Sequence, residues 1–195
     1  ALRQPLEDGR VVISRVSATL SYPCDIMLVA AMNPCPCGFY GHPTRKCVCP
    51  EGTPAKYLNR VSGPLLDRFD LHIEVPSVEF EELDSSVKSE GSAAIKKRVN
   101  AARKLQQQRY SGKGFSCNSN LTPALLHEYC HLTEDARAFL KRAFEKLGMS
   151  GRAYDRVLKV ARTIADLDGS DTITKDHIAE TVQYRSLDRK YWQQK

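Results

Sequence analysis

The chain has 195 residues, which is enough for one large domain or two small ones. Hydrophobic residues make up 42% and charged residues 27%, which describes an ordinary soluble globular protein. No apolar run approaches the roughly 20 residues that span a bilayer, so no membrane partner is expected. The first residues lack the basic and then apolar regions of a signal peptide, and we expect a cytoplasmic protein. The missing initiator Met leads us to expect a fragment.

The net charge of +6 is unevenly distributed along the chain. Residues 1–80 hold eight Lys and Arg and eight Asp and Glu, whereas residues 81–195 hold 21 and 15. A basic second half permits binding to a polyanion such as nucleic acid. A solvated helical surface is the alternative, and charge alone favours that alternative.

The first half alternates apolar and polar segments in a way that predicts an α/β fold. Residues 26–31 are continuously apolar, as in a strand that is buried on both faces. Pro, Gly and Cys dominate residues 34–54, which predicts a loop. The remaining predictions are a strand at 11–20 ended by 21–23, one or two helical turns at 55–62, and a strand at 70–75.

The second half becomes helical from about residue 91. Residues 111–120 predict a polar linker, and Thr122-Pro123 predicts a helix start. Apolar stripes at helical spacing predict further helices, with Gly148 as a C-cap and Ser150 and Thr174 as N-caps. We therefore expect three parts: 1–80 as an α/β region, 81–120 as a basic helix and linker, and 121–195 as a helical bundle.

Four cysteines form the pattern C-x-C-x9-C-x-C, namely Cys35, Cys37, Cys47 and Cys49. Two close thiol pairs joined by a loop can supply four thiolates to a tetrahedral zinc ion, which would order a loop that has few apolar residues. His42 is a substitute ligand if one cysteine fails. Four free thiols in a mobile loop are the alternative. Zinc is favoured because isolated cysteines rarely cluster in this way.

Three further residues suggest phosphate chemistry, although each has a simpler interpretation. Asn33 ends an apolar segment, where α/β sheets place their ligand crevice, but it can also form a turn before proline. Arg68 can stabilise a transferring phosphoryl group, or it can pair with a nearby carboxylate. Arg152 lies at a predicted helix start, where a cation opposes the helix dipole, or it belongs to a basic face with Arg156 and Arg162.

The groups that hold nucleotide phosphates and Mg²⁺ are absent from the sequence. There is no G-x4-G-K-[ST] loop, and SGKG at 111–114 has the wrong spacing. No apolar strand ends in a metal-binding Asp-Glu pair.

Taken together, the motifs resemble the magnesium-chelatase-like AAA+ proteins of the ComM (YifB) group. The matching stretches are ALRQPLEDGRVVISR, IMLVAAMNPCPCG, YLNRVSGPLLDRFDLHIEVP and GRAYDRVLKVARTIADLDG. The resemblance covers nearly all of the chain and matches the carboxyl-terminal part of the family. It implies a partial AAA+ core that lacks its Walker A and B segments, followed by a carboxyl-terminal helical lid.

The resemblance also implies residue roles and partners. Asn33 matches sensor 1, Arg68 lies where related ATPases carry an arginine finger for a neighbouring subunit, and Arg152 matches sensor 2. Residues 11–20 match a hairpin that faces DNA in the channel of related helicases. ATP and Mg²⁺ would bind to the full-length protein, which would assemble into a ring, a hexamer by family analogy. The cysteine pattern varies within the family, so zinc is not part of the shared chemistry.

Three functions compete at this point. The first is a fragment of an ATP-driven motor for branch migration of DNA during competence, inactive as an ATPase when isolated. The second is a zinc-stabilised DNA-binding module in which the arginines contact phosphates. The third, a metal-insertion subunit, is weakest because nothing in the sequence indicates a porphyrin site.

Overall fold

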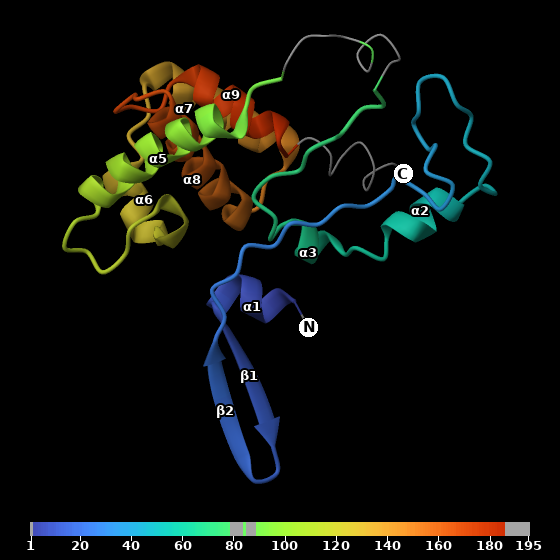
Figure 1. The fold of residues 1–195 in the computed structure, drawn as a ribbon, viewed down its shortest axis with the longest axis horizontal. Helices are drawn as coiled ribbons and strands as arrows, with labels where there is room; N and C mark the ends of the chain where they lie inside the picture. Colours follow the sequence, from blue (N-terminus) through green and yellow to red (C-terminus); the bar gives the residue numbers. More distant parts are fainter. Residues whose placement is uncertain (1, 79–83, 85–88, 186–195) are drawn as a thin grey trace. The chain divides into compact units, whose positions relative to one another are not determined.

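The protein is described by a computed structural model that covers residues 2–78, 84 and 89–185 (Figure 1). Parts of the predicted ranges 1–80, 81–120 and 121–195 lie outside these residues. The chain divides into two compact units, and the division falls between Phe69 and Asp70. Each unit is described by itself.

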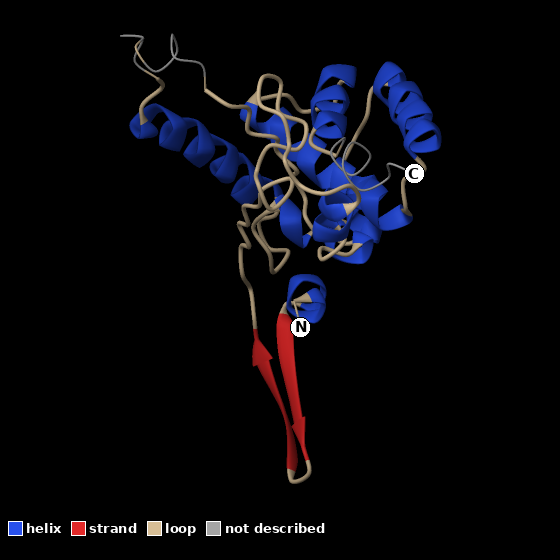
Figure 2. Cartoon of the chain, turned by 90° about the vertical axis from the view of Figure 1, so that its right-hand side faces the viewer, coloured by secondary structure: helices blue, strands red, loops and turns tan. Residues whose placement is uncertain are grey.

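The first unit begins with helix α1 (Arg3–Asp8), which no sequence pattern predicted. Gly9 ends it in the left-handed region at φ 62°, and its N–H donates to Pro5 O at 3.1 Å. Strands β1 (Arg10–Arg15) and β2 (Ala18–Pro23) follow and pair in an antiparallel hairpin (Figure 2). Two short helices complete the unit, α2 (Thr53–Leu58) and α3 (Gly63–Leu66), each with Pro in its first turn.

The hairpin corrects the prediction of a single strand at 11–20, and it agrees with the hairpin that the family resemblance implied for these residues. Arg15 pairs with Ala18, so residues 16–17 form a two-residue turn in the middle of the predicted strand. Residues 21–23 do not end the strand but pair with residues 10–12. Alternating residues on both sides of a tight turn look like one strand when the turn carries no Gly or Asn to mark it.

The predicted strands at 26–31 and 70–75 are not formed in the structure. Both segments lack strand pairing, and their apolar side chains are largely exposed, with Met27 at 90% and Val75 at 83%. A strand needs a neighbour to satisfy its backbone N–H and C=O groups. Within the described residues the hairpin is the only sheet, so these segments have no strand to pair with.

The second unit is helical, as the sequence predicted. Its helices in chain order are α5 (Ser92–Arg109), the 3₁₀ turn η1 (Asn118–Asn120), α6 (Pro123–Tyr129), α7 (Glu134–Leu147), α8 (Gly151–Leu167) and α9 (Lys175–Gln183). The predicted ends are confirmed. The Ser150 side chain accepts from Ala153 N at 3.2 Å, and Gly148 adopts φ 53°. Thr174 and His177 form a capping box.

One continuous apolar core holds this unit together. The central helix α8 contributes Val157, Leu158, Ala161 and Ala165, which are buried at helical spacing. Helices α5, α6 and α9 pack against α8, and α7 packs against α9, in the upper left of Figure 1. The core is completed by Tyr110, Leu121, Leu126, Cys130, Ala136, Leu140, Ile173 and Ile178.

Candidate functional site

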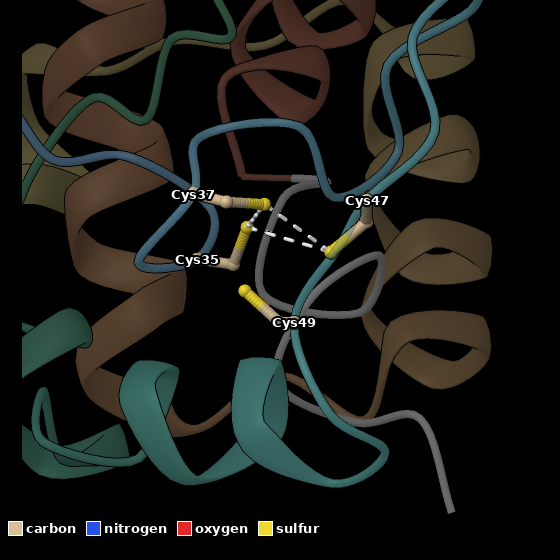
Figure 3. Close-up of side chains that lie close together, drawn as sticks. All are labelled: Cys35, Cys37, Cys47 and Cys49. Atoms are coloured by element: carbon tan, nitrogen blue, oxygen red, sulfur yellow. Dashed lines mark hydrogen bonds between the residues drawn. The ribbon is translucent and has the colours of Figure 1, made fainter.

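The four clustered cysteines converge on one point in the first unit (Figure 3). Their sulfur atoms all lie within 4.8 Å of one another. The sulfur of Cys35 lies 3.3 Å from that of Cys37 and 3.8 Å from that of Cys47, and Cys37 and Cys47 are 3.5 Å apart. The two ends of the predicted loop 34–54 therefore meet through their cysteines.

These distances fit the ligand set of a tetrahedral metal ion. Four thiolates about 2.3 Å from zinc place their sulfur atoms about 3.8 Å apart. Cys35 is fully buried, and the other three are half-buried. The backbone turns between the two pairs use Gly38 at φ 83° and Gly41 at φ 79°, a conformation that L-residues rarely adopt.

Without a metal, the thiols of the cluster differ in pKa: that of Cys37 is lowered, and those of Cys47 and Cys49 are raised. The backbone N–H of Phe39 donates to the Cys37 sulfur and lowers the pKa of this thiol to about 6. By contrast, although a backbone hydrogen bond opposes the change, burial and the neighbouring cysteine sulfurs raise the pKa of Cys49 to about 12. A metal that binds all four cysteines would therefore have to displace protons from the cluster. His42 is not needed as a substitute, since its Nδ1 accepts from the backbone N–H of Arg45 at 3.0 Å and closes the turn.

Asn33 lies two residues before the cluster and is exposed. It lies in the extended segment that follows the hairpin rather than at the end of a formed strand. The short covalent distance to Cys35 means that a metal-ordered loop would restrict where the amide can lie.

Arg68 follows helix α3 and is largely buried, with 12% of its side chain exposed. Its guanidinium pairs with Glu7 of helix α1 and donates to Pro64 O at 2.5 Å. Its Nε atom is buried without a hydrogen-bond partner among the described residues. The sequence suggested a neighbouring carboxylate as the alternative partner, but the ion pair reaches back 61 residues to Glu7.

Arg152 lies in the second unit, in the first turn of α8, and is exposed. No acidic residue shares this turn, so the positive end of the helix dipole and the guanidinium combine at one surface. Such a surface favours an anion. The structure thus places Asn33 and Arg68 in one unit and Arg152 in the other, each in its own surroundings.

The structure corrects the assignment of Arg162 to a basic face of α8. Arg162 is 1% exposed, and its Nε donates to Asp166 at 3.1 Å. The Asp166 carboxylate also accepts from Arg109 at 3.0 Å and from Asn118 at 2.9 Å. Burial alone would raise the pKa of Asp166, but these hydrogen bonds outweigh it and hold the pKa below its ordinary value. Arg162 and Asp166 are four residues apart on a predicted helix, so the sequence could have predicted this ion pair.

Two other contacts were not predicted from the sequence. Arg156 on α8 pairs with Asp70 at 2.5 Å, and the backbone N–H of His72 donates to Tyr184 O at 2.8 Å. Both contacts tie the segment after Phe69 to the helices of the second unit. No local pattern indicates pairs that lie 86 or 112 residues apart.

Comparison with known proteins defines the class to which this fold and these motifs belong. A family model for magnesium chelatase, subunit ChlI, matches residues 1–83, and a model for the ChlI C-terminal region matches residues 89–185. The boundary between the two matches lies between the α/β segments and α5.

Individual proteins of similar sequence identify the protein family more closely. The chain is 45% identical over 190 residues to the protein YifB of Escherichia coli K12 and 44% identical to the competence protein ComM of Haemophilus influenzae. Each alignment covers 97% of this chain and 36% of the relative. A Mycobacterium bovis protein is 34% identical over 185 residues. The chain belongs to the magnesium-chelatase-like family that includes YifB and ComM, and it spans about a third of the length of these curated relatives.

The described helices contain no candidate for a membrane span, because none is both long and apolar enough.

Proposed function

We propose that these residues belong to an AAA+ ATPase that remodels DNA, with branch migration during DNA uptake or recombination as its task. Membership of the magnesium-chelatase-like family supports an ATPase. Identity of 44% to a competence protein supports a role in handling DNA. The full-length protein would bind ATP and Mg²⁺ through segments other than these residues. It would assemble into a helicase-like ring in the cytoplasm, and we expect that ring to be a hexamer. We expect the 195 residues alone not to hydrolyse ATP.

In this proposal Asn33 orients the attacking water at its own subunit's nucleotide. An amide can donate to a phosphate oxygen and accept from a water at the same time. The cysteine cluster holds zinc in a structural role, and the metal fixes the loop that starts two residues after Asn33. When bound, the zinc supplies cross-linking and no catalytic step.

Arg68 stabilises charge at the nucleotide of a neighbouring subunit. Its present partner, Glu7, is a carboxylate of its own unit, and the Glu7 side chain is 34% exposed. A γ-phosphate carries more charge than Glu7 and can compete for the guanidinium. The ion pair with Glu7 is therefore the arrangement that we expect for Arg68 when no neighbouring subunit is bound.

Arg152 binds the nucleotide phosphates from the lid. Its exposure at the first turn of α8, with no acidic residue in that turn, supports this role. The exposed apolar segments at 26–31 and 70–75 would pair with further strands of the full-length protein.

A zinc-stabilised DNA-binding module without its own ATPase role is the second candidate. The converging cysteines and the basic second half support it. It differs from the first proposal in what Arg68 does, since a phosphate contact to DNA would affect DNA affinity and leave ATP hydrolysis intact.

Mixing two inactive variants of the full-length protein separates these functions. Arg68→Ala should lower ATP hydrolysis roughly 10³-fold or more, as loss of an arginine finger does. Asn33→Ala should also lower it. A mixture of the two should recover activity, because an Arg68→Ala subunit keeps its own Asn33 and receives Arg68 from an Asn33→Ala neighbour.

Arg60→Ala is the matched control, since Arg60 is exposed in the same unit and lies over the Tyr57 ring. It should leave hydrolysis unchanged. The proposal fails if Arg68→Ala hydrolyses ATP at the rate of the Arg60→Ala control. Mixed rings that assemble but stay inactive would contradict the assignment of Arg68 to a neighbour's site.

A further inference from the structure

Helix α5 carries the whole charge excess of the chain. It contains six Lys and Arg residues and no Asp or Glu, whereas the chain contains 29 and 23. The rest of the protein is therefore balanced. By contrast, α7 mixes acidic residues at Glu134, Asp135 and Glu145 with its four basic residues. A solvated surface helix normally interleaves both signs, so α5 calls for a different account.

Two of the six cations on α5 are already paired. Arg109, at the last turn, donates to the buried carboxylate of Asp166. Arg98 pairs with Glu90 at 2.7 Å. The other four cations are exposed and form no ion pair with a described residue, and we call them the α5 cation face: Lys96, Lys97, Arg103 and Lys104.

The α5 cation face points away from the core of the second unit. Helix α5 packs beside α8 through Ala102 and Gln106, which are 4% and 3% exposed (Figure 1). At 100° per residue, the α5 cation face spans about a third of the helix circumference on the opposite side. Lys97 and Lys104 are seven residues apart, as are Lys96 and Arg103, so each pair is separated by about 10.5 Å along the axis.

The N-terminal half of the helix is open to a large partner. Every residue from Ser92 to Ala101 is exposed, including Ile95 and Val99, which continue the stripe of Ala102 beyond the core. A helix that carries cations on one side and contains no acidic residue to repel an anion is suited to binding a polyanion of regular shape.

We propose that the α5 cation face binds the phosphate backbone of double-stranded DNA without regard to sequence. This proposal rests on the proposed function, because it names a surface through which such a motor would hold its DNA. Duplex DNA carries one negative charge per about 1.7 Å of axis, so Lys96 and Lys97 can neutralise phosphates about 10.5 Å from those that Arg103 and Lys104 neutralise. Binding would release counterions and would weaken steeply with salt.

The test compares two fourfold variants of the full-length protein by fluorescence anisotropy with a random-sequence duplex at several salt concentrations. One variant is Lys96→Gln, Lys97→Gln, Arg103→Gln and Lys104→Gln. The matched control is Arg137→Gln, Lys141→Gln, Arg142→Gln and Lys146→Gln, which removes equal charge from the exposed side of α7.

We expect the α5 variant to bind DNA roughly tenfold to hundredfold more weakly at low salt, with a salt slope smaller by about 1 for each phosphate that the variant no longer neutralises. The α7 control should keep the slope of the unchanged protein. Equal slopes for the two variants would overturn the proposal. So would an unchanged protein that binds phosphatidylserine vesicles but no duplex.

ATP hydrolysis without DNA, measured on the same samples, keeps the two proposals apart. It should be equal in the α5 variant and the unchanged protein. If the unchanged protein hydrolyses no ATP but the α5 variant alone loses DNA affinity, the ATPase proposal fails and the DNA surface stands. If hydrolysis is normal and DNA affinity is unaffected by the α5 changes, the DNA surface fails and the ATPase proposal stands.

Discussion

Each of the two units is stabilised internally by a different kind of interaction. The helical unit has a continuous apolar core around α8 and a buried ionic network at Asp166. In the described part of the first unit, the buried apolar side chains are Cys35, Leu58, Leu66 and Pro54. Folding free energy scales with apolar area removed from water, so the first unit needs another source of order. We propose that the four converging cysteines supply that order by binding a metal ion.

The largest expected effect is loss of the metal from the first unit. Structural zinc contributes about 10–16 kcal/mol in zinc-finger peptides, far more than this unit's apolar contacts can replace. Cys47→Ser should raise hydrogen exchange across residues 34–54 and leave the helices from Pro123 to Gln183 protected. Cys117→Ser is the matched control, because Cys117 is half-buried but lies outside the cluster. Similar exchange at 34–54 in both variants would show that the cysteines do not order the loop.

Breaking the ionic network should destabilise the helical unit strongly. Asp166→Asn leaves Arg162 and Arg109 without their shared carboxylate, and removing one partner of a buried pair costs about 3–5 kcal/mol. Urea unfolding followed by helical circular dichroism measures the loss. Asp168→Asn is the control two residues away, where the side chain is 67% exposed and pairs with His177. Equal losses of unfolding free energy in the two variants would show that the buried network stabilises the unit no more than the exposed pair of Asp168 does.

The network also predicts how the helical unit responds to acid. The pKa of Asp166 in the folded state is held below its ordinary value of 3.8 by its hydrogen bonds. Its contribution to stability is therefore present above the unfolded-state pKa and is lost as the pH falls through the folded-state pKa. Between pH 5 and pH 3 the unchanged chain should lose more stability than Asp166→Asn. Parallel stability curves for the two proteins would contradict this.

The smallest expected effect is at the start of α8. Ser150→Ala removes the hydroxyl that accepts from Ala153 N and should cost about 1 kcal/mol. Ser111→Ala, at an exposed position, should change the free energy of unfolding much less. If the Ser111 and Ser150 changes had the same effect, the cap would not contribute.

The same contrast explains what the sequence could predict. Apolar stripes and caps are local, so α7 and α8 were predicted with their ends at Gly148 and Ser150. The cysteine cluster was predictable because its spacing is local at each end and thiols have few other reasons to group. The capping chemistry at Thr174 followed from the same logic.

What escaped prediction depends on distant residues. The pair of Arg68 with Glu7 and the network of Asp166 with Asn118 join positions that share no local pattern. Residues 111–120 were predicted as a polar linker, yet Asn118 is 2% exposed because it bonds Asp166 and Tyr110. The apolar segment 26–31 was predicted as a strand from its composition alone, but composition does not supply a pairing partner.

Zinc analysis tests the central claim of a metal-ordered first unit most directly. The protein would be purified without added zinc, and its metal content and X-ray absorption spectrum would be measured. The account predicts one zinc per chain with four sulfur ligands at about 2.3 Å. Much less than one equivalent of zinc, or coordination dominated by nitrogen and oxygen, would contradict it.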